Sequence, residues 1–193
     1  MLEVVTGTKE ELQAAVELEA KKIADEEAAL RALALTHWII FLDFDGVLNY
    51  NDFFSRRIEG GDEFDRACVA RLNRLVKTLD AVVVISSSWR HGRSLQELRQ
   101  ILEAHGFVGT IIDKTPKYVR NADPLSKREY GQRGDEIRAW LDALPEKTER
   151  FIVLDDNSDM RAVMTHFVQT PFYGGGLTDE KVEEVLRLAQ RFS

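Results

Sequence analysis

Two aspartates one residue apart follow a run of apolar residues in the segment Phe41-Leu-Asp-Phe-Asp-Gly-Val-Leu48. After a buried strand, the carboxylates of Asp43 and Asp45 would project into one crevice, and Gly46 would let the chain turn sharply. Two bare carboxylates repel a phosphate, so a cation is needed between them, and Mg2+ suits oxygen ligands. One carboxylate can then attack phosphorus, and the other can exchange protons with the leaving group and with water. The pattern therefore predicts a magnesium-dependent phosphoryl-transfer site, and the Gly-Val-Leu that follows disfavours a simple turn or cap made of aspartates.

A second acidic cluster, Leu154-Asp-Asp-Asn-Ser-Asp159, also follows an apolar run. From a neighbouring strand end, its carboxylates could complete the metal shell. We predict Asp156 as a metal ligand and Asp155 as a group that orients the cation or a water beside it. For Ser158 and Asp159, capping of a following helix is the favoured interpretation.

Three serines follow a further apolar run in Val84-Ile-Ser-Ser-Ser-Trp-Arg90. The first of them, Ser86, is the candidate for holding phosphate oxygens with its hydroxyl and backbone N–H. Ser87, Arg90 and Gly46 are predicted to contact the substrate, although Ser87 could cap the loop and Arg90 could pair with a surface acid. For Trp89, two interpretations stay open: a packing residue or a platform on which the substrate stacks.

A transferring phosphoryl group also needs a fixed positive charge. Arg133, just before a predicted helix over 135–144, is the favoured candidate, and Lys127 is the alternative. For Arg128 we expect only a solvated position.

The remaining pattern indicates the elements that must position these residues. Apolar runs predict strands at 38–43, 81–86, 107–112, 151–155 and 166–170. Helical spacing or capping signals predict helices over 63–79, from Ser94 to Gly106, over 135–144 and from Asp179 after the Thr178 cap. This alternation is typical of a parallel sheet covered on both faces, which binds ligands at the carboxyl ends of its strands.

Composition limits the classes of protein that fit. The chain has 193 residues, 44% hydrophobic and 31% charged, enough for one core plus an extension. Its net charge of −7 argues against broad coating of nucleic acid, and no apolar run approaches the roughly 20 residues of a membrane helix. The lone Cys68 is expected to be a buried thiol. Together these features favour the cytoplasm and predict no membrane partner.

The N-terminal segment reads as a helix from Thr8 to about Leu35, with a thin apolar stripe. We divide the chain into this helical extension, residues 1–36, and a catalytic domain, residues 37–193. The helix either packs on the core or mediates a homodimer or another partner contact.

With these segments together, the chain resembles the haloacid dehalogenase (HAD) superfamily of phosphohydrolases over about residues 37–188. The resemblance rests on Asp43-x-Asp45-Gly-Val as the first motif, Ser86 as the second and Asp155-Asp156 as the fourth. More narrowly, the segments ISSSWR, RGDEIRAWLD, LDDNSDM and GGLT resemble the HAD domains of multi-domain RNA-repair (Swiss Army Knife) proteins.

The resemblance implies a Rossmann-like three-layer α/β sandwich with strand order 5-4-1-2-3 and Mg2+ as cofactor. Asp43 would be the nucleophile and a metal ligand, and Asp45 the acid/base, with its backbone carbonyl on the metal. The other implied roles are phosphoryl binding by Ser86, charge neutralisation by Arg133 or Lys127, and completion of the metal shell by Asp156. Both first-motif carboxylates are present, which favours hydrolysis over stalled phosphotransfer and disfavours a dehalogenase.

Members of this superfamily often close the site with an inserted cap domain, and here the insertion segments 46–62 and 113–132 are too short for a large one. An open site favours a bulky substrate such as a nucleic-acid end or a phosphoprotein. Residues 114–133 carry six basic and two acidic side chains, which with Arg90, His91 and Arg93 could form a basic rim for a polynucleotide terminus. We therefore expect a phosphomonoesterase for RNA, DNA or nucleotide phosphate ends. The alternatives are a small-metabolite or protein phosphatase and a non-catalytic assembly protein.

Overall fold

A parallel sheet forms the centre of the computed structural model, which describes residues 9–56, 62–117 and 133–193. Over these residues the sheet has five strands in the order β3-β2-β1-β4-β5. The strands are β1 (Trp38–Leu42), β2 (Ala81–Ile85), β3 (Thr110–Lys114), β4 (Phe151–Asp155) and β5 (Phe167–Gln169). This order, read from the other edge, is the expected 5-4-1-2-3, so the predicted HAD-like α/β fold is confirmed.

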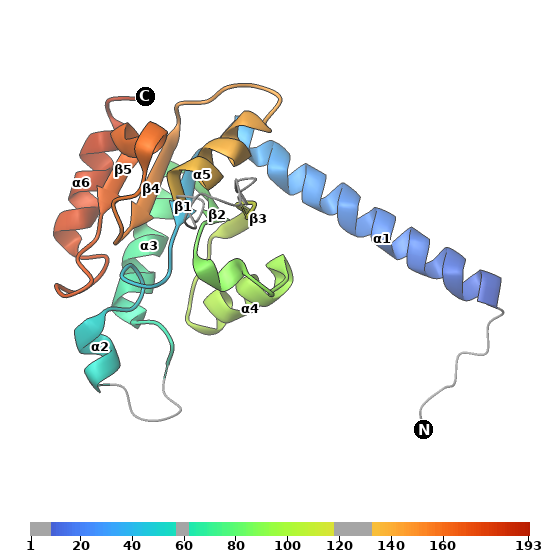
Figure 1. Ribbon diagram of the computed structural model, residues 1–193, viewed down its shortest axis with the longest axis horizontal. Helices are drawn as coiled ribbons and strands as arrows, with labels where there is room; N and C mark the ends of the chain where they lie inside the picture. Colours follow the sequence, from blue (N-terminus) through green and yellow to red (C-terminus); the bar gives the residue numbers. More distant parts are fainter. Residues whose placement is uncertain (1–8, 57–61, 118–132) are drawn as a thin grey trace, which may run out of the picture.

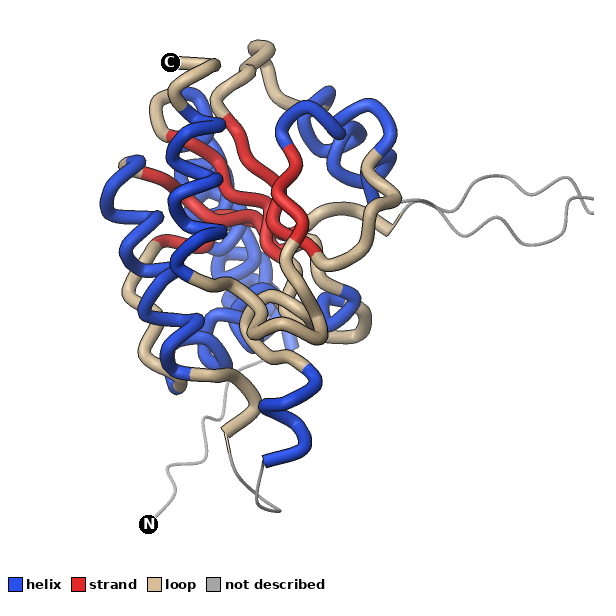
Figure 2. Tube along the Cα trace, turned by 90° about the vertical axis from the view of Figure 1, so that its left-hand side faces the viewer, coloured by secondary structure: helices blue, strands red, loops and turns tan. Residues whose placement is uncertain are grey.

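Helices cover both faces of the sheet (Figure 2). Successive residues of β1 point to opposite faces: Trp38, Ile40 and Leu42 belong to one buried cluster, and Ile39 and Phe41 belong to the other. The first cluster is completed by α3 (Arg66–Leu79), α4 (Leu95–Ala104) and α6 (Asp179–Ala189). The second is completed by α5 (Arg133–Asp142) and the short 3-10 helices η1 (Leu33–Leu35) and η3 (Arg161–His166). These are the three layers that the sequence predicted.

The register of the three central strands decides where the polar residues meet. Leu42 of β1 pairs with Ile85 of β2 on one side and with Leu154 of β4 on the other. The next residue along each strand is Asp43, Ser86 or Asp155, so these three lie in one row at the carboxyl edge of the sheet. Backbone hydrogen bonds hold this row, with the Asp43 N–H donating to the Leu154 carbonyl and the Ser86 N–H to the Leu42 carbonyl, each at 2.9 Å.

Several element boundaries differ from the predicted ones. β3 begins at Thr110 rather than Phe107, because Gly106 adopts a left-handed φ of 90° and the chain turns before it becomes extended. α3 begins at Arg66, where the Asp65 side chain caps it by accepting a hydrogen bond from the Ala67 N–H. A short helix, α2 (Asn51–Arg56), lies in the segment 46–62 and was not predicted.

The helix α1 (Lys9–Ala32) extends far beyond the sheet domain in Figure 1. Its residues 11–29 are exposed, and its C-terminal part lies against the domain, where Ala24, Glu27 and Ala28 line a pocket together with Leu95 and Ile112. There, Arg31 lies 3.5 Å from a carboxylate oxygen of Asp113 and 5.2 Å from the centre of the Trp140 ring. Packing on the core is therefore limited to the C-terminal part of the helix, and the homodimer contact along it stays a prediction. Among the described residues, no helix has the length and apolar character needed to cross a membrane.

Candidate active site

The row of polar residues at the carboxyl edge of the sheet faces α5. Asp43 continues the alternation of Ile39 and Phe41, and Asp155 continues that of Phe151 and Val153, so both side chains lie on the face that α5 covers. Asp43 is 4% exposed and Asp155 is fully buried. Burial of two carboxylates in adjacent strand ends is costly unless cations compensate them.

Three carboxylates gather at this point. One oxygen from each of Asp43, Asp155 and Asp156 lies within 4.8 Å of the others. The pKa of Asp155 is raised to about 8, chiefly by burial and also by the Asp43 carboxylate, while Arg133 opposes the rise. Burial also raises the pKa of Asp43 and of Asp156. The site therefore concentrates more negative charge than its protein surroundings neutralise.

Arg133 supplies the positive charge at the start of α5. Its Nε lies 3.2 Å from Asp155 Oδ2, and its Nη2 lies 3.4 Å from Asp43 Oδ2. Its backbone N–H donates to Asp159 Oδ2 at 3.0 Å, so Asp159 tethers the start of α5 rather than capping a helix that follows it. Arg133 thus contacts the carboxylates of Asp43 and Asp155. The alternative candidate, Lys127, lies outside the described residues.

The Asp45 carboxylate is held apart from the acidic group by two hydrogen bonds. Trp89 Nε1 donates to Asp45 Oδ2, and Asn49 Nδ2 donates to Asp45 Oδ1, each at 2.9 Å. Trp89 therefore has a polar contact that the sequence analysis did not foresee. Asn49 was missed as well, although it lies four residues after Asp45, the spacing of a single helical turn. These contacts orient the carboxylate predicted to move protons.

The serines after β2 divide between the site and the loop. Ser86 is fully buried, and within the described residues its Oγ has no hydrogen-bond partner. A buried hydroxyl without a partner, in the row with Asp43 and Asp155, is suited to a bound oxyanion. The Ser87 hydroxyl accepts from the Trp89 N–H at 3.3 Å, and its hydrogen bond to Asp43 opposes the rise in the pKa of that carboxyl.

Arg90 has a different role from the predicted substrate contact. It is 4% exposed, and its guanidinium donates to the carbonyls of Ser86 and Ser87 at 2.5 and 2.7 Å. It also donates to the Thr115 carbonyl at 3.0 Å and pairs with the buried Glu136. Because these groups occupy its donors, Arg90 fixes the loop after β2 from beneath, and it cannot join the expected basic rim.

Gly46 is required by the close approach of the fourth motif to the first. Its φ is +76°, and a Cβ at this position would lie 2.4 Å from Asp156 Cβ. Any side chain here would displace Asp156 from the acidic group. The predicted substrate contact of Gly46 stays a prediction, but its packing against Asp156 is a structural reason for glycine.

The residues present fit a divalent cation of the Mg2+ type. Asp43, Asp155 and Asp156 offer only oxygen donors, which Mg2+ prefers. Burial is the largest cause of their raised pKa values, and the Asp43 carboxylate adds to the rise at Asp155 and Asp156, so a bound cation would favour the ionised forms. The Asp45 carboxylate is not in this group among the described residues, so its predicted ligation would have to use the backbone carbonyl.

The fold and the acidic strand-end site define a HAD-like hydrolase domain. A comparison with protein families matches residues 39–182 to the family described as the HAD domain in Swiss Army Knife RNA repair proteins. This match covers well over half of the 193 residues, so the chain belongs to that family, and both levels of the resemblance are confirmed. The membership supports a HAD-type phosphohydrolase. No curated protein and no solved structure matches the chain.

Proposed function

We propose that the protein is a Mg2+-dependent phosphomonoester hydrolase that works through an aspartyl-phosphate on Asp43. The observation that carries this proposal is the placement of Asp43, which is buried beside the Arg133 guanidinium and in one cluster with the carboxylates of Asp155 and Asp156. A carboxylate in this position can attack phosphorus because the surrounding charges favour an incoming phosphoryl group once a cation is bound.

The residues around Asp43 divide the chemistry between them. Asp43 forms a bond to phosphorus while the bond from phosphorus to the leaving oxygen breaks, and Asp45 donates a proton to that oxygen. Asp45 then takes a proton from water, which attacks the aspartyl-phosphate and releases inorganic phosphate. Ser86 and Arg133 hold the phosphoryl oxygens. Bound Mg2+, held by Asp43, Asp155 and Asp156, would neutralise the negative charge of the phosphoryl group.

The substrate we propose is a nucleotide or polynucleotide phosphate end. The family match supports it, because the family takes its description from RNA repair proteins. The basic segment predicted to form a rim lies largely at 118–132, outside the described residues. The nucleic-acid substrate therefore depends on the family and on the sequence rather than on the shape of this rim.

Hydrolysis of p-nitrophenyl phosphate with and without Mg2+ tests the reaction class. We expect activity that requires Mg2+, is abolished by EDTA and falls to the uncatalysed rate in Asp43→Asn. Asp142→Asn is the matched control, because Asp142 is an exposed aspartate of α5 whose side chain is 62% exposed. Equal activity in wild type and Asp43→Asn would exclude Asp43 as nucleophile, and no activity in wild type would favour a non-catalytic assembly protein.

Phosphate release from 3′- and 5′-phosphorylated oligonucleotides, mononucleotides and glycerol phosphate tests the substrate class. A polynucleotide substrate predicts the highest kcat/KM for one of the oligonucleotides and a decline with added salt. A preference for glycerol phosphate, or rates that do not respond to salt, would instead indicate a small-metabolite phosphatase.

A further inference from the structure

A pocket opens beside the acidic group, at the ends of β4 and β5. Asp155 pairs with Gln169 in the sheet, so the next residues, Asp156 and Thr170, lie side by side. Both line a pocket of about 790 Å3, within the usual range of roughly 300–1,000 Å3 for small-molecule sites. Because Asp156 belongs to the metal-binding group, a ligand in this pocket has one end at the predicted phosphoryl site.

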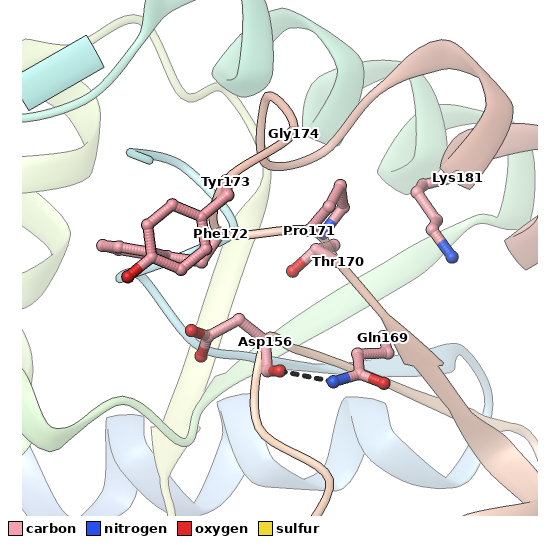
Figure 3. Close-up of a pocket in the computed structure, with 8 residues that line it drawn as sticks. All are labelled: Asp156, Gln169, Thr170, Pro171, Phe172, Tyr173, Gly174 and Lys181. Carbon is pink, nitrogen blue, oxygen red and sulfur yellow. Dashed lines mark hydrogen bonds between the residues drawn. The ribbon is translucent and has the colours of Figure 1, made fainter. Parts of the chain in front are cut away.

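Two aromatic rings form one wall of the pocket. In Figure 3 the rings of Phe172 and Tyr173 lie above the Asp156 carboxylate. They meet edge to face with ring centroids 5.1 Å apart, and Tyr173 is 79% exposed. An aromatic side chain this exposed, next to a charged site, offers a free surface for stacking.

The aromatic wall is fixed to the first-motif loop. The Asn51 N–H donates to the Phe172 carbonyl at 3.0 Å, and the Leu177 N–H donates to the Val47 carbonyl at 2.9 Å. Gly176, with a φ of +63°, packs so close that a Cβ there would lie 2.7 Å from the same Val47 carbonyl. The pocket and the catalytic aspartates are therefore positioned by one set of backbone contacts.

Polar groups face the same pocket. Thr170 is 2% exposed, and its hydroxyl has no hydrogen-bond partner among the described residues. In Figure 3 this buried hydroxyl is turned toward the side of the rings, and Lys181 lies at the opposite end from the rings. The Gln169 amide donates to the Asp156 carbonyl at 2.7 Å and so holds that wall in place. A buried hydroxyl without a partner indicates a ligand that supplies one.

We infer that this pocket binds the nucleoside that carries the phosphate, with its base stacked on Tyr173 and a sugar hydroxyl on the Thr170 Oγ1. This inference rests on the proposed function and specifies its substrate. A nucleoside combines a flat aromatic base with hydroxyl groups, which matches an aromatic wall opposite a buried polar group. A phosphotyrosine side chain carries no free hydroxyl, so it would leave Thr170 without a partner.

Substrate comparison in Tyr173→Ala tests the subsite. We expect the ratio of kcat/KM for nucleoside monophosphates to that for glycerol phosphate to fall about 5- to 150-fold, the equivalent of losing one base–aromatic stack. Tyr173→Phe should keep the ratio near that of wild type. Val108→Ala is the matched control, because Val108 is 82% exposed and precedes β3, at the edge of the sheet opposite the site. Phosphorylated trinucleotides show the same fall if the pocket takes the terminal nucleoside of a polynucleotide, and no fall if it takes only free mononucleotides.

An equal loss on glycerol phosphate and on nucleotides would overturn the inference, because the ring would then only shape the loop. A larger loss on a phosphotyrosine peptide than on nucleotides would overturn it in favour of a protein substrate. Nucleotide binding to Asp43→Asn, measured by calorimetry with Mg2+, separates the two proposals. If wild type shows no hydrolysis, the proposed function fails, whereas the subsite still requires Tyr173→Ala to weaken binding in the Asp43→Asn background.

Discussion

Replacing Asp155 by Asn should change how the stability of the metal-free protein depends on pH. Burial and the adjacent Asp43 raise the pKa of Asp155 from an ordinary 3.8 to about 8. Between these pH values the folded protein keeps a proton that the unfolded chain releases. The stabilisation from this proton is therefore fully present below pH 3.8 and is lost as pH rises through about 8.

The size of the effect follows from the shift. Each unit of pKa shift corresponds to about 1.4 kcal/mol, so between pH 5 and pH 8 the wild type should lose about 3–4 kcal/mol that Asp155→Asn does not lose. The assay is urea unfolding followed by circular dichroism in EDTA, at pH 5, 6, 7 and 8. Groups far from Asp155 contribute alike to the stability of both proteins, and their contributions cancel in the difference between the two.

Two results would refute the reasoning. If the unfolding free energies of wild type and Asp155→Asn run parallel from pH 5 to pH 8, Asp155 does not carry a raised pKa. The second result concerns Mg2+, which under the proposed function binds the ionised carboxylates and should therefore stabilise wild type more at pH 8 than at pH 5. Stabilisation by Mg2+ that is equal at both pH values, or equal in Asp155→Asn, would exclude this carboxylate from the cation site.

Other substitutions test the groups around the site. Trp89→Phe keeps the ring but removes the donor to Asp45, so kcat for p-nitrophenyl phosphate should fall about tenfold in steady-state assays; an unchanged kcat would mean that this contact does not orient the acid/base. Gly46→Ala forces a Cβ to within 2.4 Å of Asp156, a proposed metal ligand, and should lower the unfolding free energy by about 1–3 kcal/mol and weaken Mg2+ binding in calorimetric titrations. Unaltered Mg2+ affinity would contradict that packing argument. Glu136→Gln removes one charge of the buried pair with Arg90 and should cost about 3–5 kcal/mol in urea unfolding, and a loss below about 1 kcal/mol would show that the pair is dispensable.

Local sequence patterns predicted the strands well, and the capping signals at Ser94 and Thr178 predicted the starts of α4 and α6 correctly. The starts of α3 and α5 differ from the predicted ones by two or three residues. β1 and β2 are five-residue apolar runs and β4 has four apolar residues before Asp155, all of them buried, and such runs are distinctive in a chain. β3 begins three residues later than predicted, because the apolar Phe107 packs in the core although it lies outside the strand. The helix α2 escaped prediction, because its six residues are too few for a periodic pattern.

The site was partly predictable because several of its residues directly follow these distinctive apolar strands. Asp43, Ser86 and Asp155 each follow a strand directly, so a parallel sheet brings them to one edge once its order is known. Arg90 shows the limit of this reasoning, because its sequence position next to the serines is equally compatible with a site contact and with a buried pair. Only its tertiary neighbours, Glu136 from α5 and the Thr115 carbonyl after β3, decide between them.

The sequence by itself determined the fold class, the family and the two acidic motifs, because these depend on residue types at short, fixed spacings along the chain. The tertiary structure alone decided that Trp89 and Asn49 hold Asp45, that Arg133 lies between two carboxylates, and that the loop after β5 forms a pocket beside Asp156. The physical reason is that hydrogen bonds and ion pairs of this kind join residues up to about a hundred positions apart. Their partners are selected by strand order and register, which no local pattern encodes.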